Sequence, residues 1–303
     1  MIAIVSAPTN LGLRPPEPTS TPGTSKAPEA LREAGLHAAL LADGAIDAGV
    51  VLPGRYVDDA NPGSGRIRNQ DAVLDHAHRL ADRIGAVLDA GHRPLVLGGD
   101  CSILLGTGLA LARRGRHGLV HIDGHTDFRH PGNSDECASL AGEDLAAAIG
   151  LHWPAISDID GMGPLFSGTD VVHVGARDDD EELVEVRRLL GDVVTASEVR
   201  AHGVVDTAHR ARSVVDAAPD GSWLHLDIDV LDAAVFPAVD SPDPGGLQAD
   251  ELIELLRLLA PTAVGAQVTV FDPDLDPDGR YAMLLSRIIR EGLGALGTAR
   301  APR

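Results

Sequence analysis

The chain has 303 residues, of which 44% are hydrophobic but only 3% aromatic, and its formal net charge is −20. A field of this sign repels phosphate backbones, which argues against a nucleic-acid partner, and no apolar run of about 18 residues is present to cross a membrane. The length fits one large α/β domain or two ordinary ones; because no long linker interrupts the chain, we predict a single domain over residues 1–303.

The N-terminal segment and the cysteines predict a cytoplasmic protein. MIAIVSAPTN is typical of a first strand and lacks the basic segment of a signal peptide. Cys101 and Cys137, the two cysteines of the chain, form no disulfide framework. We therefore expect a reducing compartment, the cytoplasm.

Short runs rich in Val, Ile and Leu alternate with longer helical patterns along the chain. We expect strands at 2–6, 45–52, 94–99, 118–123, 171–175, 192–196, 223–229 and 263–271. We expect helices at 70–90, 102–113, 180–190, 204–217, 248–259 and 280–291, and long loops at 12–28, 53–65, 131–142, 150–169 and 232–246. Continuous apolar strands separated by helices predict an α/β fold with a parallel sheet buried on both faces. In such a sheet, ligands bind beyond the carboxyl ends of the strands.

Two acidic clusters follow predicted strands at that edge. GLVHIDGHTD places Asp123, His125 and Asp127 on alternate positions, and WLHLDIDVLD does the same with Asp227 and Asp229. Side chains two residues apart in an extended segment face the same way, so each cluster can present its ligands to one site. A single aspartate at a strand end is commonly a helix cap or turn residue. Four carboxylates gathered together, however, repel one another unless cations neutralise them, and one histidine with four aspartates suits two ions such as Mn²⁺.

A third segment, LVLGGDCSILLG at 95–106, ends a strand in Gly-Gly-Asp and opens a helix. Together with the two clusters, FPAVDSPDPGGL at 236–247 and VFDPDLDPDG at 270–279, it resembles the ureohydrolase family of arginases, agmatinases, guanidinobutyrases and formiminoglutamases. The resemblance covers most of the chain. It implies a three-layer α/β/α fold with an eight-stranded parallel sheet, two Mn²⁺ ions, and a metal-bridging hydroxide that attacks an amidine-type carbon. It also implies a homo-oligomer, a trimer or a hexamer.

The resemblance assigns a role to each metal ligand. Asp123 and Asp227 bridge both metals, Asp127 completes one site, and His125 and Asp229 complete the other. Cys101 stands where the family has a metal-binding histidine, as it does in some hydroxyarginine hydrolases of antibiotic pathways. A thiolate is a softer ligand that prefers Zn, Fe or Cu to Mn²⁺, and the alternative is an inert buried cysteine beside a one-metal site.

The residue that moves protons is less evident. Arginase-type members have a histidine in the loop after the first cluster, but the matching segment here, CASLAGEDLA at 137–146, has none. His130 and Glu143 are the candidates nearest in sequence for this catalytic role. Each also has an ordinary structural use, such as an acid at a helix start.

Three residues are candidates for substrate binding. The family's glutamate that pairs with the guanidinium is Val270 here, which argues against ordinary arginase activity because a charge-assisted pair of roughly 1.5–3 kcal/mol is lost. Asp240 lies in a loop that reaches the same site in the family and is a candidate to replace that carboxylate. Arg129 can either grip a substrate carboxylate or pair with neighbouring acids. Asp180 matches the family acid that pairs with a substrate amino group.

The resemblance and these residues together predict a two-metal hydrolase that cleaves a C–N bond of a small amidine-, guanidine- or formimino-type substrate. The arginine at 129 predicts that this substrate carries a carboxylate. One alternative is a degenerate family member that binds a metal or a metabolite without turnover. A further alternative is a hydrolase of ordinary amides in a biosynthetic pathway.

Overall fold

The computed structural model of the chain describes residues 1–61 and 63–299. Eight parallel strands form one sheet in the order β2-β1-β3-β8-β7-β4-β5-β6. This sheet confirms the predicted fold class. The strands are β1 (Ile2–Ala7), β2 (Ile46–Val50), β3 (Arg93–Gly98), β4 (Gly118–Ile122), β5 (Val171–Val174), β6 (Asp192–Val194), β7 (Ser222–Asp227) and β8 (Ala263–Thr269).

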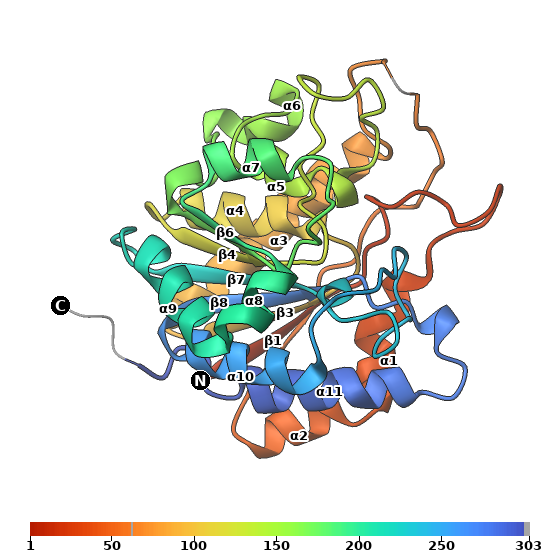
Figure 1. Cartoon of the computed structure of the whole chain (residues 1–303). Coiled ribbons are helices and arrows are strands. Elements are labelled where there is room, and N and C mark those ends of the chain that lie inside the picture. The colour runs from red at the N-terminus through yellow and green to blue at the C-terminus, as the bar shows by residue number, and fades with distance from the viewer. Residues whose placement is uncertain (62, 300–303) are drawn as a thin grey trace.

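Helices connect the strands and cover both faces of the sheet (Figure 1). They are α1 (Ala27–Glu33), α2 (Leu36–Ala42), α3 (Gln70–Asp89), α4 (Ile103–Ala112), α5 (Asp144–Ala148), α6 (Pro154–Ser157), α7 (Leu183–Leu189), α8 (Ala196–His202), α9 (Val204–Val215), α10 (Ala249–Leu259) and α11 (Arg280–Leu293). The six predicted helices correspond to α3, α4, α7, α9, α10 and α11. The shorter helices α1, α2, α5, α6 and α8 were not anticipated.

The three layers follow from the alternation of side chains along each strand. On β4, Leu119 packs in the core formed with α3, α4, α5 and α7, whereas the next residue, Val120, packs in the core formed with α1, α2 and α8–α11. Because both faces are buried, the strands are continuous apolar runs. Helix α4 is also apolar on nearly every side, and the structure buries all of its residues but the last.

Strands that are distant in sequence are neighbours at the centre of the sheet. β3, β8, β7 and β4 lie side by side, so the segments that follow them meet at one edge. Cys101, Val270 and Asp123 lie in the segments that follow β3, β8 and β4, and Asp227 is the last residue of β7. The topology therefore gathers the three motifs of the sequence at the carboxyl ends of the central strands, where parallel sheets bind ligands.

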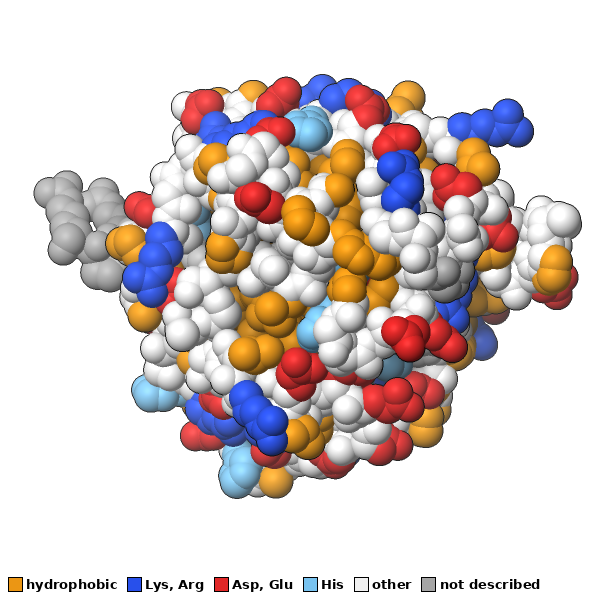
Figure 2. Space-filling model, turned by 90° about the horizontal axis from the view of Figure 1, so that it is seen from above, with side chains coloured by type: hydrophobic (Ala, Val, Ile, Leu, Met, Phe, Trp, Pro, Cys, Tyr) orange, Lys and Arg blue, Asp and Glu red, His pale blue; other side chains and the backbone are white. Residues whose placement is uncertain are grey.

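Figure 2 looks down on the layer that contains α6 and α7, and it shows apolar side chains across the middle of this face with acidic and basic groups around them. Within the described residues, no helix combines the length and the apolar character that a membrane-spanning segment requires.

Candidate metal centre and active site

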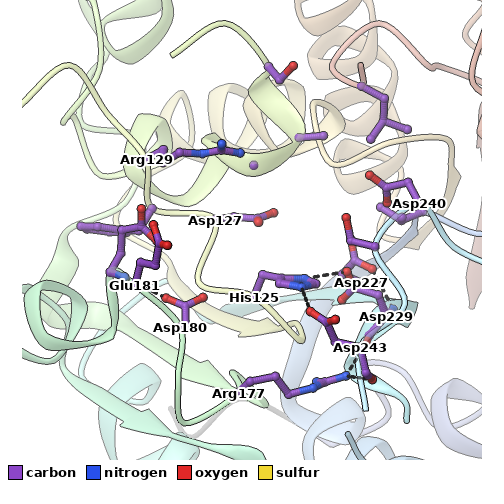
Figure 3. Close-up of a pocket in the computed structure, with 18 of the residues that line it drawn as sticks. His125, Asp127, Arg129, Arg177, Asp180, Glu181, Asp227, Asp229, Asp240 and Asp243 are labelled. Atoms are coloured by element: carbon purple, nitrogen blue, oxygen red, sulfur yellow. Dashed lines mark hydrogen bonds and ion pairs between the residues drawn. The ribbon is translucent and has the colours of Figure 1, made fainter. Parts of the chain in front are cut away.

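A pocket of about 460 Å³ opens beyond the carboxyl ends of the central strands. Its walls come from the segments after β4, β5, β7 and β8 and from the N-terminal loop at 12–14. Of the predicted site residues, those that line the pocket are His125, Asp127, Arg129, Asp180, Asp227, Asp229 and Asp240. Figure 3 shows these side chains converging from separate elements.

The structure brings all six predicted metal ligands together. Asp123, His125 and Asp229 form one group whose donor atoms lie within 4.8 Å of one another. Cys101, Asp123 and Asp227 belong to a second group of the same compactness. The Cys101 Sγ donates to Asp227 Oδ2 at 2.8 Å, so the cysteine faces the cluster. Because Asp123 belongs to both groups, the geometry agrees with a bridging position, and that role stays a prediction.

The electrostatics of these groups favour cations. Burial, followed by the charges of neighbouring carboxylates, raises the pKa values of Asp123, Asp127 and Asp227 well above their usual range. Asp123 Oδ2 has no hydrogen-bond partner. Burial and the adjacent carboxylates also raise the pKa of the Cys101 thiol. Positive ions would remove the repulsion between these carboxylates and would be coordinated by the unpartnered oxygen of Asp123. The donor set therefore fits divalent metals.

His125 is held by two carboxylates. Its Nδ1 lies 2.9 Å from Asp229 Oδ2, and its Nε2 lies 3.0 Å from Asp243 Oδ2. The charge of Asp229 raises the pKa of His125 to about 10, despite partial burial, and His125 in turn outweighs burial to lower the pKa of Asp229. An imidazole that donates through one nitrogen to a carboxylate presents the other to a metal in a fixed orientation. Asp243 thus has the position of an orienting residue, although no sequence motif pointed to it.

Two residues of the pocket have left-handed backbone conformations. Asp127 has φ 48° and the buried Val270 has φ 71°, a region that a β-branched residue rarely adopts. The N–H of Val270 donates to the carbonyl oxygen of Gly99 at 2.7 Å, which ties the end of β8 to the Gly-Gly-Asp segment. Backbone strain of this kind is concentrated at functional sites.

Neither candidate for proton transfer reaches the pocket. His130 lies beside Glu185, with its Nε2 3.4 Å from Glu185 Oε1. Glu143 is fully buried; its carboxylate accepts hydrogen bonds from the N–H groups of Ala138 and Ser139 and faces His152 Nε2 at 3.0 Å. Glu143 therefore shapes the loop whose small residues line the pocket. The catalytic role of the two candidates stays a prediction that this placement does not favour.

The substrate-binding candidates differ in how they are engaged. Asp180 accepts hydrogen bonds from the N–H and the hydroxyl of Thr126 at 2.9 and 2.7 Å. It therefore holds the loop that follows β4 in place, and it also lines the pocket. Asp240 lines the pocket. Desolvation, followed by the negative charge of Asp229, raises the pKa of its carboxyl group to about 6. Within the described residues, no ion pair joins Arg129 to a carboxylate, and Figure 3 shows its guanidinium apart from the labelled acids.

Further buried polar residues lie close to the predicted metal ligands. Asp144 is fully buried, and its donor atoms group with those of Cys101 and Asp127. His173, His121 and His225 occupy matched positions on β5, β4 and β7, and all three are fully buried. These four residues were not among the candidates predicted from the sequence. A signal was available, because three predicted strands each place a histidine at an interior position that a buried strand would give to an apolar residue.

Comparison with known proteins identifies the family of the chain. A model of the Arginase family matches residues 1–294. An arginase of Brevibacillus brevis is 30% identical over 302 residues, covering 97% of each chain. A formimidoylglutamase of Aeromonas hydrophila is 29% identical over 246 residues, covering 75% of this chain and 71% of the relative. The native structure of an arginase from Bacillus caldovelox has a TM-score of 0.85 at 29% identity, covering 97% of this chain and 98% of that one. The chain belongs to the arginase family.

Proposed function

We propose that this protein is a two-metal hydrolase that cleaves a guanidino, amidino or formimino C–N bond in a small substrate that also carries a carboxylate. Family membership and relatives named arginase and formimidoylglutamase support the general reaction. The observation that carries the proposal is the convergence of two metal-ligand groups, which share Asp123, at a pocket of about 460 Å³.

The charges of the pocket support a substrate with both a cationic and an anionic end. Nine acidic side chains line it, against three arginines. The donors of Arg177 go to backbone carbonyl oxygens, including those of Asp229 and Asp243 at 3.0 Å, so this arginine is structural. Arg129 is free to form the two parallel hydrogen bonds that suit a carboxylate. The acidic wall, including Asp240, would hold an amidinium-like group.

The residues of this chain would divide the work as follows. Asp123, His125, Asp127, Asp227 and Asp229, with Cys101, would hold the ions. When bound, two divalent ions supply positive charge that lowers the pKa of a water molecule and polarises the substrate. Asp243 would keep the Nε2 proton of His125 in place, which would leave Nδ1 as the atom available to a metal ion. Val270 makes the pocket wall apolar where the family pairs a guanidinium, so we expect a substrate other than arginine.

The test combines metal content with a substrate screen. Protein stripped by a chelator is reloaded with Mn²⁺, Co²⁺ or Zn²⁺, and bound metal is counted by mass spectrometry. Guanidino and formimino compounds, each with and without a carboxylate, are then assayed for urea, formamide or ammonia. We expect two ions for each chain and turnover of a carboxylate-bearing compound. The control is Asp229→Asn, which should retain fewer ions and lose turnover.

A contrary result would identify the alternative. Two bound ions without any product across the screen would indicate a degenerate family member that binds metal without turnover. Fewer than one ion for each chain would reject the two-metal centre itself.

A further inference from the structure

Asp144, the first residue of α5, is a buried carboxylate that the protein leaves unpartnered. Its exposed fraction is 0%, and neither carboxylate oxygen has a hydrogen-bond partner in the described structure. Burying a charge without a partner is unfavourable. A nearby positive ion would remove this cost, because it would coordinate the two free oxygens.

The orphaned carboxylate faces the metal centre. A carboxylate oxygen of Asp144, a carboxylate oxygen of Asp127 and the Sγ of Cys101 all lie within 4.8 Å of one another. The same Sγ lies 2.8 Å from Asp227 Oδ2, so Asp144 lies beside the group that contains Asp227. The group combines one sulfur with carboxylate oxygens, a donor set that can hold a divalent transition metal.

Two histidines flank Asp144 on its inner side. The rings of His121 and His225 are stacked, with centroids 4.5 Å apart and planes 2° from parallel. His121 Nε2 lies 3.7 Å from Asp144 Oδ1 and 3.9 Å from Asp123 Oδ2. His225 also belongs to the compact group formed by Asp144 and His121.

The hydrogen bonds of Gln267 decide which role His225 can have. Gln267 Oε1 accepts from Trp223 Nε1 at 3.2 Å and from the Thr107 hydroxyl at 2.6 Å, which fixes the amide orientation because the indole N–H can only donate. Gln267 Nε2 therefore donates to His225 Nδ1 at 2.6 Å. In the neutral ring the proton is then on Nε2, which has no other partner. His225 is thus a hydrogen-bond donor toward the carboxylates and not itself a metal ligand.

We propose that Asp144 is an additional metal ligand, which shares one ion with Cys101 and Asp127, and that His121 and His225 orient its carboxylate from the inner side. This inference rests on the proposed two-metal function and adds a ligand to one of its sites. It explains why a buried carboxylate without a partner lies next to two buried histidines. Histidine–carboxylate–metal arrangements of this kind fix the position of the ligand and tune the affinity for the ion.

The test compares Asp144→Asn with Glu143→Gln. Both residues are fully buried neighbours, but Glu143 has its hydrogen bonds satisfied and lies outside the ligand groups that contain Cys101. Binding of Mn²⁺ to metal-free protein is measured by calorimetry, and thermal unfolding is measured without metal. Asp144→Asn should weaken the binding of one Mn²⁺ ion by at least about tenfold and leave the affinity for the other unchanged. It should also raise the melting temperature of the metal-free protein. Glu143→Gln should keep both affinities and lower that temperature.

A cobalt titration identifies which ion Asp144 holds. Co²⁺ bound by Cys101 gives a sulfur-to-metal charge-transfer band. Asp144→Asn should raise the Co²⁺ concentration at which that band is half-developed by at least about tenfold. Asp229→Asn, which alters the group formed with His125, should leave the midpoint in place. Wild-type affinity for both ions in Asp144→Asn would overturn this inference and leave the proposed function standing. Wild-type protein that binds fewer than two ions would overturn both.

Discussion

The metal-free protein should become less stable as the pH rises from 7 to 9. The pKa of His125 is about 10 in the folded protein, against an ordinary value of 6.5. A raised pKa means that the folded state holds a proton that the unfolded state has released, so this contribution to stability is complete below pH 6.5 and is lost as the pH approaches 10. The raised pKa values of Asp123, Asp127 and Asp227 act in the same direction.

The magnitude follows from the number of protons involved. One extra proton in the folded state gives a slope of about −1.4 kcal/mol per pH unit, so His125 alone accounts for roughly 2–3 kcal/mol between pH 7 and 9. Saturating Mn²⁺ should abolish this decline, because a metal-bound imidazole carries no proton on the ligating nitrogen and metal affinity rises as ligands deprotonate.

The assay is urea denaturation of chelator-treated protein at several pH values and constant ionic strength. His125→Gln should make the slope shallower by about 1.4 kcal/mol per pH unit. The matched control is His209→Gln, which alters an exposed histidine on α9 and should retain the wild-type slope. A stability that rises between pH 7 and 9 without metal, or a slope that His125→Gln leaves unchanged, would refute the reasoning.

Three further variants test individual ligands and contacts. Asp227→Asn should lose at least one ion while far-ultraviolet circular dichroism stays native; full occupancy would remove Asp227 from the ligand set. Cys101→Ser should weaken the binding of Cd²⁺ much more than the binding of Mn²⁺, because thiolate is a soft ligand that suits Cd²⁺ better. Equal losses of affinity for the two ions in parallel titrations would contradict sulfur ligation. Arg129→Lys should raise KM roughly tenfold or more for a carboxylate-bearing substrate, while kcat/KM for the analogue without the carboxylate changes little; additive losses in that double cycle would show that Arg129 does not contact the carboxylate.

The sequence was most informative where the chain is buried. The strands and the longer helices follow from apolar patterns. The meeting of the six proposed metal ligands could also be predicted, because they lie at or after the ends of strands that meet at one edge of a parallel sheet. Asp243 could not be predicted in this way, since it reaches His125 from a loop without periodicity. Asp144 resembles an ordinary acid at a helix start, and only its burial and lack of partners distinguish it. Nearness in sequence did not identify a proton-transfer residue, because His130 and Glu143 both lie outside the pocket.

The strand order also determines when the metal centre can form. Cys101 and Asp227 are 126 residues apart in the chain and become neighbours only when β8 and β7 have joined β3. Contacts of such long range must overcome a large loop-closure entropy and therefore form late in folding. Ions at the proposed centre would then bind a nearly finished sheet, and we expect them not to guide its assembly. We expect Mn²⁺ to slow unfolding while leaving the folding rate nearly unchanged. The metals would then increase the kinetic stability of the native state.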